Sequence, residues 1–200
     1  MADRTNTTAA ARPRRADAER SIARILDAAV DSLSRDPDAS MAEIARQAGV
    51  VRATIYVHFP TRETLIAAVT DRAIEEVTRI ITETQPRDGE PIEALERVVR
   101  AAWKTLGRYH ALVAVNSRLP HAELHDRHAP VIAALLPLIE RGQNARAFRP
   151  DVPAAWHLAT LLALIHSASA ELAAGRVADD LAETALVASV VGALTGGTAR

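Results

Sequence analysis

The 200-residue sequence has no cysteine, few aromatic residues and no long apolar segment. Without cysteine, the chain forms no disulfide and no thiolate-ligated zinc site. Aromatic residues make up only 3% of the chain, which disfavours an aromatic cage for a flat cationic ligand. The longest apolar runs, 158–165 and 185–194, are far shorter than a bilayer-spanning helix, and the N-terminus lacks an apolar signal core. We therefore expect a soluble, cytoplasmic protein with no membrane contact.

The charge and the missing motifs exclude further classes of protein. The formal net charge is -1, so the whole molecule is not a general polyanion binder, although arginines gather locally near the N-terminus. The sequence has no G-x-S-x-G, no phosphate-binding loop and no H-E-x-x-H pattern. We therefore expect no enzyme activity, no catalytic residues and no cofactor.

Hydrophobic residues make up 48% of the chain and recur at helical spacing, whereas no segment alternates like a strand. The sequence thus predicts an all-α fold. We expect helices near 17–34, 40–59 (two short helices), 62–81, 91–106, 112–119, 131–141, 153–174 and 179–194. In the helix near 131–141, Pro137 is expected to cause a kink, and Gly142 is expected just past the helix end.

The last two predicted helices are apolar on more than one face. A surface helix needs only one apolar stripe, so the excess indicates a second contact. Ala188, Val191 and Gly192 are small enough to let helices approach closely. We therefore expect a homodimer that forms through these two helices.

Residues 40–62 contain the most informative pattern in the chain. Ser40 and Glu43 have the spacing of a capping box, and Gly49 supplies the positive φ that ends a short helix. Pro60 stops the next helix, and Thr61 can cap the one that follows. The pattern predicts a helix-turn-helix at about 40–59, whose second helix would enter the major groove of DNA.

These residues resemble the DNA-binding domain of the TetR family of bacterial regulators. The resemblance is carried by Ala45, Ala48-Gly49-Val50, Thr54-Ile55-Tyr56, His58-Phe59, Thr61-Arg62-Glu63 and Leu65. It implies a three-helix DNA-binding domain at 18–78 and a helical ligand-binding and dimerisation domain at 79–200. Residues 1–17, which are rich in threonine, alanine and arginine, are expected to form a disordered basic arm. The resemblance also implies a repressor that binds a near-palindromic double-stranded DNA operator and is released by a small-molecule effector.

The resemblance assigns DNA contacts to outward-facing residues of the motif. Arg52 would contact a guanine or a phosphate, and the remaining residues would contact phosphates or the groove margin. The full set is Ser40, Arg52, Thr54, Tyr56, His58 and Arg62. Two positions depart from the family pattern, because Val51 replaces a small polar cap and Val57 replaces a polar or aromatic residue. These departures keep open the alternative of a ligand-binding or interaction protein with a degenerate helix-turn-helix.

Two groups of residues are candidates for ligand binding in the C-terminal part. The first consists of polar or large side chains on apolar helices, which could line an aliphatic cavity: Trp103, His110, Asn116, Trp156 and His166. The second is His121, His125 and His128, whose spacing places three imidazoles on one helical face. Pro120 and Pro130 confine that segment to about two turns. We therefore expect no metal site, and a metal-responsive regulator is kept as an alternative.

Overall fold

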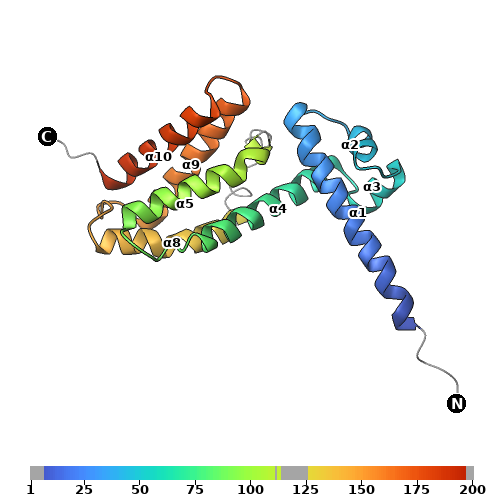
Figure 1. Ribbon diagram of the computed structural model, residues 1–200, viewed down its shortest axis with the longest axis horizontal. Coiled ribbons are helices and arrows are strands. Elements are labelled where there is room, and N and C mark those ends of the chain that lie inside the picture. Colours follow the sequence, from blue (N-terminus) through green and yellow to red (C-terminus); the bar gives the residue numbers. More distant parts are fainter. Residues whose placement is uncertain (1–6, 111, 114–125, 197–200) are drawn as a thin grey trace, which may run out of the picture. The chain divides into compact units, whose positions relative to one another are not determined.

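The structure, a computed structural model, describes residues 7–110, 112–113 and 126–196, with side chains from residue 17 onward. These residues form helices and no strand, which confirms the all-α prediction (Figure 1). The helices are α1 (Thr7–Arg35), α2 (Met41–Gln47), α3 (Arg52–His58), α4 (Arg62–Glu83), α5 (Pro91–Leu106), the 3-10 helix η1 (Gly107–Tyr109), α8 (Ala129–Asn144), α9 (Ala154–Ala173) and α10 (Asp179–Thr195).

The chain divides into two compact units, Met1–Val69 and Thr70–Arg200. The DNA-binding domain was predicted to end at residue 78, which is nine residues beyond the end of the first unit at Val69. α4 runs without interruption from Arg62 to Glu83, so its first two turns belong to the first unit and the rest to the second. Among the described residues, no helix combines the length and the apolar character that crossing a bilayer requires.

In the first unit, α2 packs against both α1 and α3. The core consists of aliphatic side chains that recur at helical spacing, including Ile25 and Leu33 of α1, Ile44 of α2 and Ile55 of α3. A polar contact supports this packing, because Ser32 Oγ of α1 donates to Oε1 of Gln47 on α2 at 2.9 Å. The three helices of the predicted DNA-binding domain therefore share one small core.

The first helix begins earlier than the sequence analysis predicted. α1 starts at Thr7 rather than at residue 17, so it includes most of the segment that was expected to be a disordered arm. Alanine and arginine are frequent between residues 9 and 20, and both have high helix propensity, which accounts for the extension. Pro13 lies within this extension.

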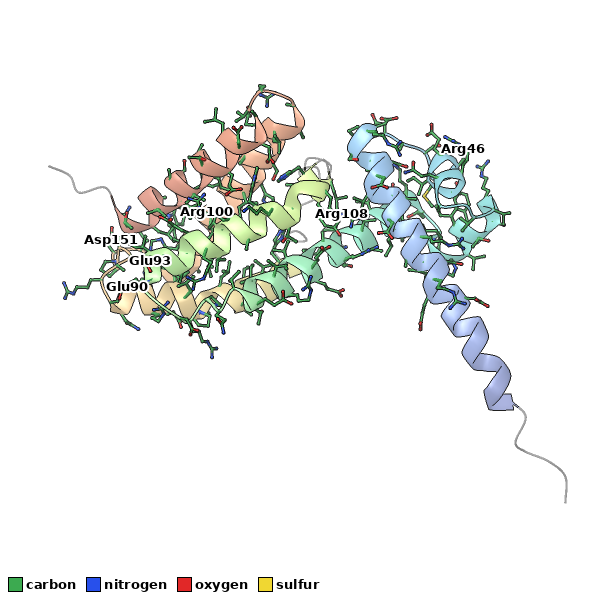
Figure 2. All side chains as sticks on the ribbon, viewed as in Figure 1. Arg46, Glu90, Glu93, Arg100, Arg108 and Asp151 are labelled. Carbon is green, nitrogen blue, oxygen red and sulfur yellow. The ribbon has the colours of Figure 1, made fainter. Side chains whose placement is uncertain are left out.

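In the second unit, α9 packs against α8 and α10, and α5 packs against α8 and α10 (Figure 1). The core is aliphatic apart from three buried aromatic residues, Trp103, Tyr109 and Phe148. Two polar contacts join α5 to α10. Trp103 Nε1 donates to Oδ1 of Asp179 at 3.1 Å, and Arg100, labelled in Figure 2, forms a 3.2 Å ion pair with Glu183.

The end of α8 corrects the prediction for Gly142. The helix continues past this glycine to Asn144, and Pro137 lies inside it. Arg146 then adopts a φ of 59°, and the amides of Ala147 and Phe148 both donate to the Gly142 carbonyl, at 2.9 and 3.0 Å. This turn places the buried Phe148 ring directly on Gly142. Gly142 is therefore a packing position, not a helix stop.

Candidate functional site

The turn between α2 and α3 forms as the sequence predicted. Ser40 and Glu43 make the reciprocal capping box, and Gly49 has a φ of +65°. The Val50 amide donates to the Ala45 carbonyl at 3.0 Å, which closes the turn. Val51 is the N-cap of α3 and its side chain makes no capping hydrogen bond. The second helix therefore starts without side-chain support, as its valine cap led us to expect.

Several predicted DNA contacts lie on the solvent side of α3. Arg52 and Tyr56 are exposed, Thr54 and His58 are half-buried, and Ile55 is fully buried. The Arg52 guanidinium carbon lies 5.7 Å from the centre of the Tyr56 ring, so these two side chains form one projecting group. Arg46, labelled in Figure 2, is exposed on α2 and adds a cation to the same unit.

Ser40 and Arg62 have other partners within the protein. The amide and hydroxyl of Ser40 each donate to Oε2 of Glu43 at 2.9 Å, and these bonds hold the pKa of the Glu43 carboxyl below its usual value. Arg62 donates to the backbone carbonyls of Pro37 and Ala39, which fixes the loop between α1 and α2. A phosphate would compete with Glu43 for the donors of Ser40, and it would have to use the remaining N–H groups of Arg62.

A cavity of about 70 Å³ lies within the second unit. Its walls come from α4, α5, η1, α8 and α9, together with Leu112 and Val113. The lining is mainly aliphatic and includes Ile74 and Val77 of α4, Ala102 of α5 and Leu161 of α9. The side chains that bring polar groups to it are Thr70, Tyr109, His128 and His166. This arrangement suits an apolar ligand with one or two hydrogen-bonding groups.

The polar groups of the cavity have defined surroundings. The rings of His128 and His166 meet edge to face with their centres 5.2 Å apart. Burial, together with the charge of a protonated His128, lowers the pKa of His166 to about 4, so His166 is neutral at pH 7. Tyr109 Oη donates to Oε2 of Glu76 at 2.7 Å. Burial and this carboxylate raise the pKa of Tyr109 to about 12, so its proton is retained.

Of the five residues predicted to bind ligand, His166 lines the cavity. Trp103 and His110 are buried beside each other with ring centres 4.3 Å apart, and they are not part of the lining. His110 Nδ1 lies 3.0 Å from Ser169 Oγ. Trp156 is 65% exposed and also lies off the cavity, and Asn116 falls outside the described residues.

Comparisons with known proteins agree with this geometry. Residues 25–69, from α1 through the first turns of α4, match the family model for bacterial regulatory proteins of the tetR family. The chain is a TetR-family transcriptional regulator. Members of this family bind DNA, and they are not enzymes, in agreement with the missing catalytic motifs.

Two TetR-type relatives illustrate the likeness. The HTH-type transcriptional regulator NfxB of Pseudomonas aeruginosa is 29% identical over 149 residues, which is 72% of this chain and 78% of NfxB. The HTH-type transcriptional repressor LfrR of Mycolicibacterium smegmatis is 35% identical over 83 residues, or 42% of this chain and 44% of LfrR.

Solved structures extend the likeness over most of the chain. The crystal structure of LfrR in complex with proflavine has a TM-score of 0.70 at 25% identity, and covers 88% of this chain and 97% of that one. The structure of FadR from Bacillus subtilis in complex with stearoyl-CoA has a TM-score of 0.69 at 18% identity, over 86% and 98% of the two chains. The likeness to FadR shows the fold alone.

The predicted histidine cluster of His121, His125 and His128 lies mostly outside the described residues. His121 and His125 are not described, whereas His128 pairs with His166 at the cavity. The described part of the chain contains no group of three acidic or histidine side chains placed to hold a metal ion.

Thr70 and Tyr109 line the cavity, although neither was predicted to do so. Thr70 is a single polar residue on the apolar stripe of α4, and Tyr109 lies in the three-residue helix η1, which is too short to show a periodic pattern.

Proposed function

We propose that this regulator is a repressor. It binds a near-palindromic operator as a homodimer, with one α3 helix in each of two successive major grooves. A small molecule that occupies the cavity of the second unit releases the DNA. The observation that carries the proposal is the continuity of α4, which begins in the DNA-binding unit and lines the cavity from Thr70 to Ile81.

The size of the cavity supports a mechanism through α4. Pockets that hold drug-sized ligands measure roughly 300–1,000 Å³, far more than the 70 Å³ found here. A ligand must therefore push apart the helices that line the cavity, and α4 is one of them. A ligand that binds a displaced form of α4 more tightly shifts the population away from the form that fits DNA. By linkage, the operator weakens ligand binding by the same factor.

The lining favours a neutral or weakly polar aliphatic ligand. LfrR has been crystallised with proflavine. The described lining of the present cavity contains one tyrosine and no tryptophan or phenylalanine, which gives little surface for stacking a flat cationic ring. The neutral imidazole of His166 can donate or accept one hydrogen bond, and it lies beside His128. We therefore infer an apolar molecule whose polar end bonds His166.

The proposed dimer face lies on α9 and α10. Their exposed residues between Ala155 and Ser167 and between Leu181 and Gly192 carry no charge. They are Ala155, Trp156, Ala159, Ala163 and Ser167 of α9, with Leu181, Thr184, Ala185, Ala188, Ser189 and Gly192 of α10. Trp156 and Leu181 are large apolar side chains that are 65% and 60% exposed in the protomer. A second copy that covers this face would bury both.

The operator contact is tested first with Arg52→Ala and Tyr56→Phe. Both side chains are exposed, so the free energy of unfolding should change by less than about 0.5 kcal/mol. The DNA probe is the intergenic fragment upstream of the gene that encodes this protein. Loss of a good base or phosphate contact should weaken binding to this fragment by about 1–3 kcal/mol. Fluorescence anisotropy at several salt concentrations measures this, and wild-type affinity should fall steeply as salt rises. If the wild-type protein shows no preference for this fragment over random DNA at any salt concentration, the proposal that it is a repressor is wrong.

Ligand binding is tested by a thermal-shift screen of small aliphatic acids, alcohols and esters, with zinc and nickel in parallel. A ligand present at a hundred times its Kd stabilises the native state by about 2.7 kcal/mol. We expect Ala102→Leu, which fills the cavity, to lose both this shift and the release of operator while it still binds DNA. Ala133→Leu, on the exposed side of α8, is the matched control. If only metals raise the melting temperature, and His128→Ala abolishes that effect, the regulator responds to metal instead.

A further inference from the structure

The part of α3 that projects furthest from the protein is apolar. An α-helix has about 3.6 residues per turn, so residues two positions before and after a given residue lie on its opposite side. Ile55 is fully buried, and Ala53 and Val57 therefore project directly away from the core. Their exposure agrees, because Ala53 is exposed and Val57 is 78% exposed.

Polar side chains flank this apolar pair on both sides. Arg52 and Tyr56 lie together along one side of α3, where the guanidinium group covers the Tyr56 ring. Thr54 and His58 lie along the other side and are half-buried. The two members of each pair are four positions apart in the sequence, so each pair forms a row along the helix. The helix thus presents a central apolar strip between two polar rows.

A helix in the major groove turns its most projecting strip toward the base edges and its flanks toward the two phosphate backbones. The edges of the four base pairs carry hydrogen-bond donors and acceptors, and the one alkyl group among them is the C5-methyl of thymine. Ala53 and Val57 have no side-chain hydrogen-bonding group to offer. Their surface is therefore complementary to thymine methyl groups and leaves the polar groups of other bases unpaired.

We infer that Val57, together with Ala53, selects thymine at the centre of each operator half-site through contact with its methyl group. This inference rests on the proposed binding of α3 in the major groove. It gives Val57 a direct function, and it moves Arg52 from the centre of recognition to its edge, with Tyr56, Thr54 and His58. The departure at position 57 then becomes a specificity determinant of this chain.

The test begins with selection of duplexes from a random pool by the full-length protein. In the selected duplex, each thymine is replaced in turn by deoxyuridine, which removes the methyl group and keeps every hydrogen-bonding group. We expect one or two thymines per half-site at which the replacement weakens binding by about fourfold, the effect of burying one methyl group. In Val57→Ala, the same replacement should change affinity by less than about 1.5-fold at the thymine that contacts Val57, because the valine methyl groups are gone. A thymine that contacts Ala53 should keep its response.

Val51→Ala is the matched control, because it removes the same two methyl groups from a 70% exposed valine that precedes the helix. This variant should keep the full wild-type response at the thymines that sense Val57. Two outcomes overturn the inference without contradicting the proposed repressor: a duplex whose affinity is indifferent to every thymine methyl, and thymine responses that are all unchanged in Val57→Ala. A pool that yields no enriched sequence overturns both.

Discussion

Replacing Ala188 with aspartate is expected to dissociate the proposed dimer and to weaken operator binding by at least about a hundredfold. Ala188 is exposed in the protomer and lies within the uncharged part of α10. A two-fold interface contains each substitution twice. An unpaired charge buried in an interface costs about 3–5 kcal/mol, and about 1.4 kcal/mol corresponds to a tenfold change in affinity. Monomers also lose the gain in affinity that comes from linking two recognition helices.

Sedimentation equilibrium and anisotropy with the selected operator duplex measure both effects. The control is Ala133→Asp, which makes the same substitution at an exposed position of α8. It should leave the dimer and the operator affinity unchanged. An Ala188→Asp variant that sediments as the wild-type dimer would mean that the interface lies on another face.

The structure also changes which residues can test the interface. In the sequence, Val187 and Val191 lie in the same apolar helix as Ala188, so aspartate at either valine is an equally direct test of the interface on the sequence alone. Val187 is 4% exposed and packs in the core of the protomer, and Val191 packs partly against that core. Aspartate at Val187 would unfold the protomer before it could report on a dimer. Helical periodicity alone could not separate these faces, because α10 is apolar on both.

The DNA-binding unit was predictable because its signals are local. The capping box of Ser40 and Glu43, the positive φ of Gly49 and the reciprocal cap of Thr61 and Thr64 each involve residues at most three apart. Interactions of this kind are encoded by short spacings. The hydrogen bonds from Arg62 to the carbonyls of Pro37 and Ala39 were not predictable, because these partners lie more than twenty residues away in the sequence.

The cavity was harder to predict because it depends on how five elements pack. His166 and His157 both lie on α9 and have the same chemistry. His166 lines the cavity, whereas His157 is buried elsewhere with Nε2 2.9 Å from the Arg149 carbonyl. Trp156, the neighbour of His157, faces solvent. The face that a helix turns toward its neighbours is a property of tertiary packing, and a single apolar stripe does not determine it when most of the helix is apolar.

Gly142 is another position whose environment depends on tertiary packing, and here the consequence concerns the stability of the fold. The sequence suggested a helix end, whereas the structure gives a close approach of the Phe148 ring to the helix backbone. A β-carbon at residue 142 would lie 2.8 Å from Cγ of Phe148 and closer still to two carbons of the ring. Phe148 is only 1% exposed, and the hydrogen bonds from residues 147 and 148 to the Gly142 carbonyl fix the approach of the loop. The ring therefore has little freedom to move away.

Gly142→Ala is accordingly expected to lower the free energy of unfolding by about 2 kcal/mol. Overpacking a core costs about 1–3 kcal/mol, and an overlap this close to the ring puts the cost near the upper end. The better helix propensity of alanine returns about 1 kcal/mol, which leaves about 2 kcal/mol. Urea unfolding measures the change. Gly107→Ala is the control, because a β-carbon there meets no atom within 4 Å, and it should leave the midpoint unchanged or raise it. Phe148→Leu provides a second test. If the ring is the obstacle, the Gly142→Ala/Phe148→Leu double variant loses less stability than the sum of the two single variants, whereas strict additivity would mean that Gly142 is required for another reason.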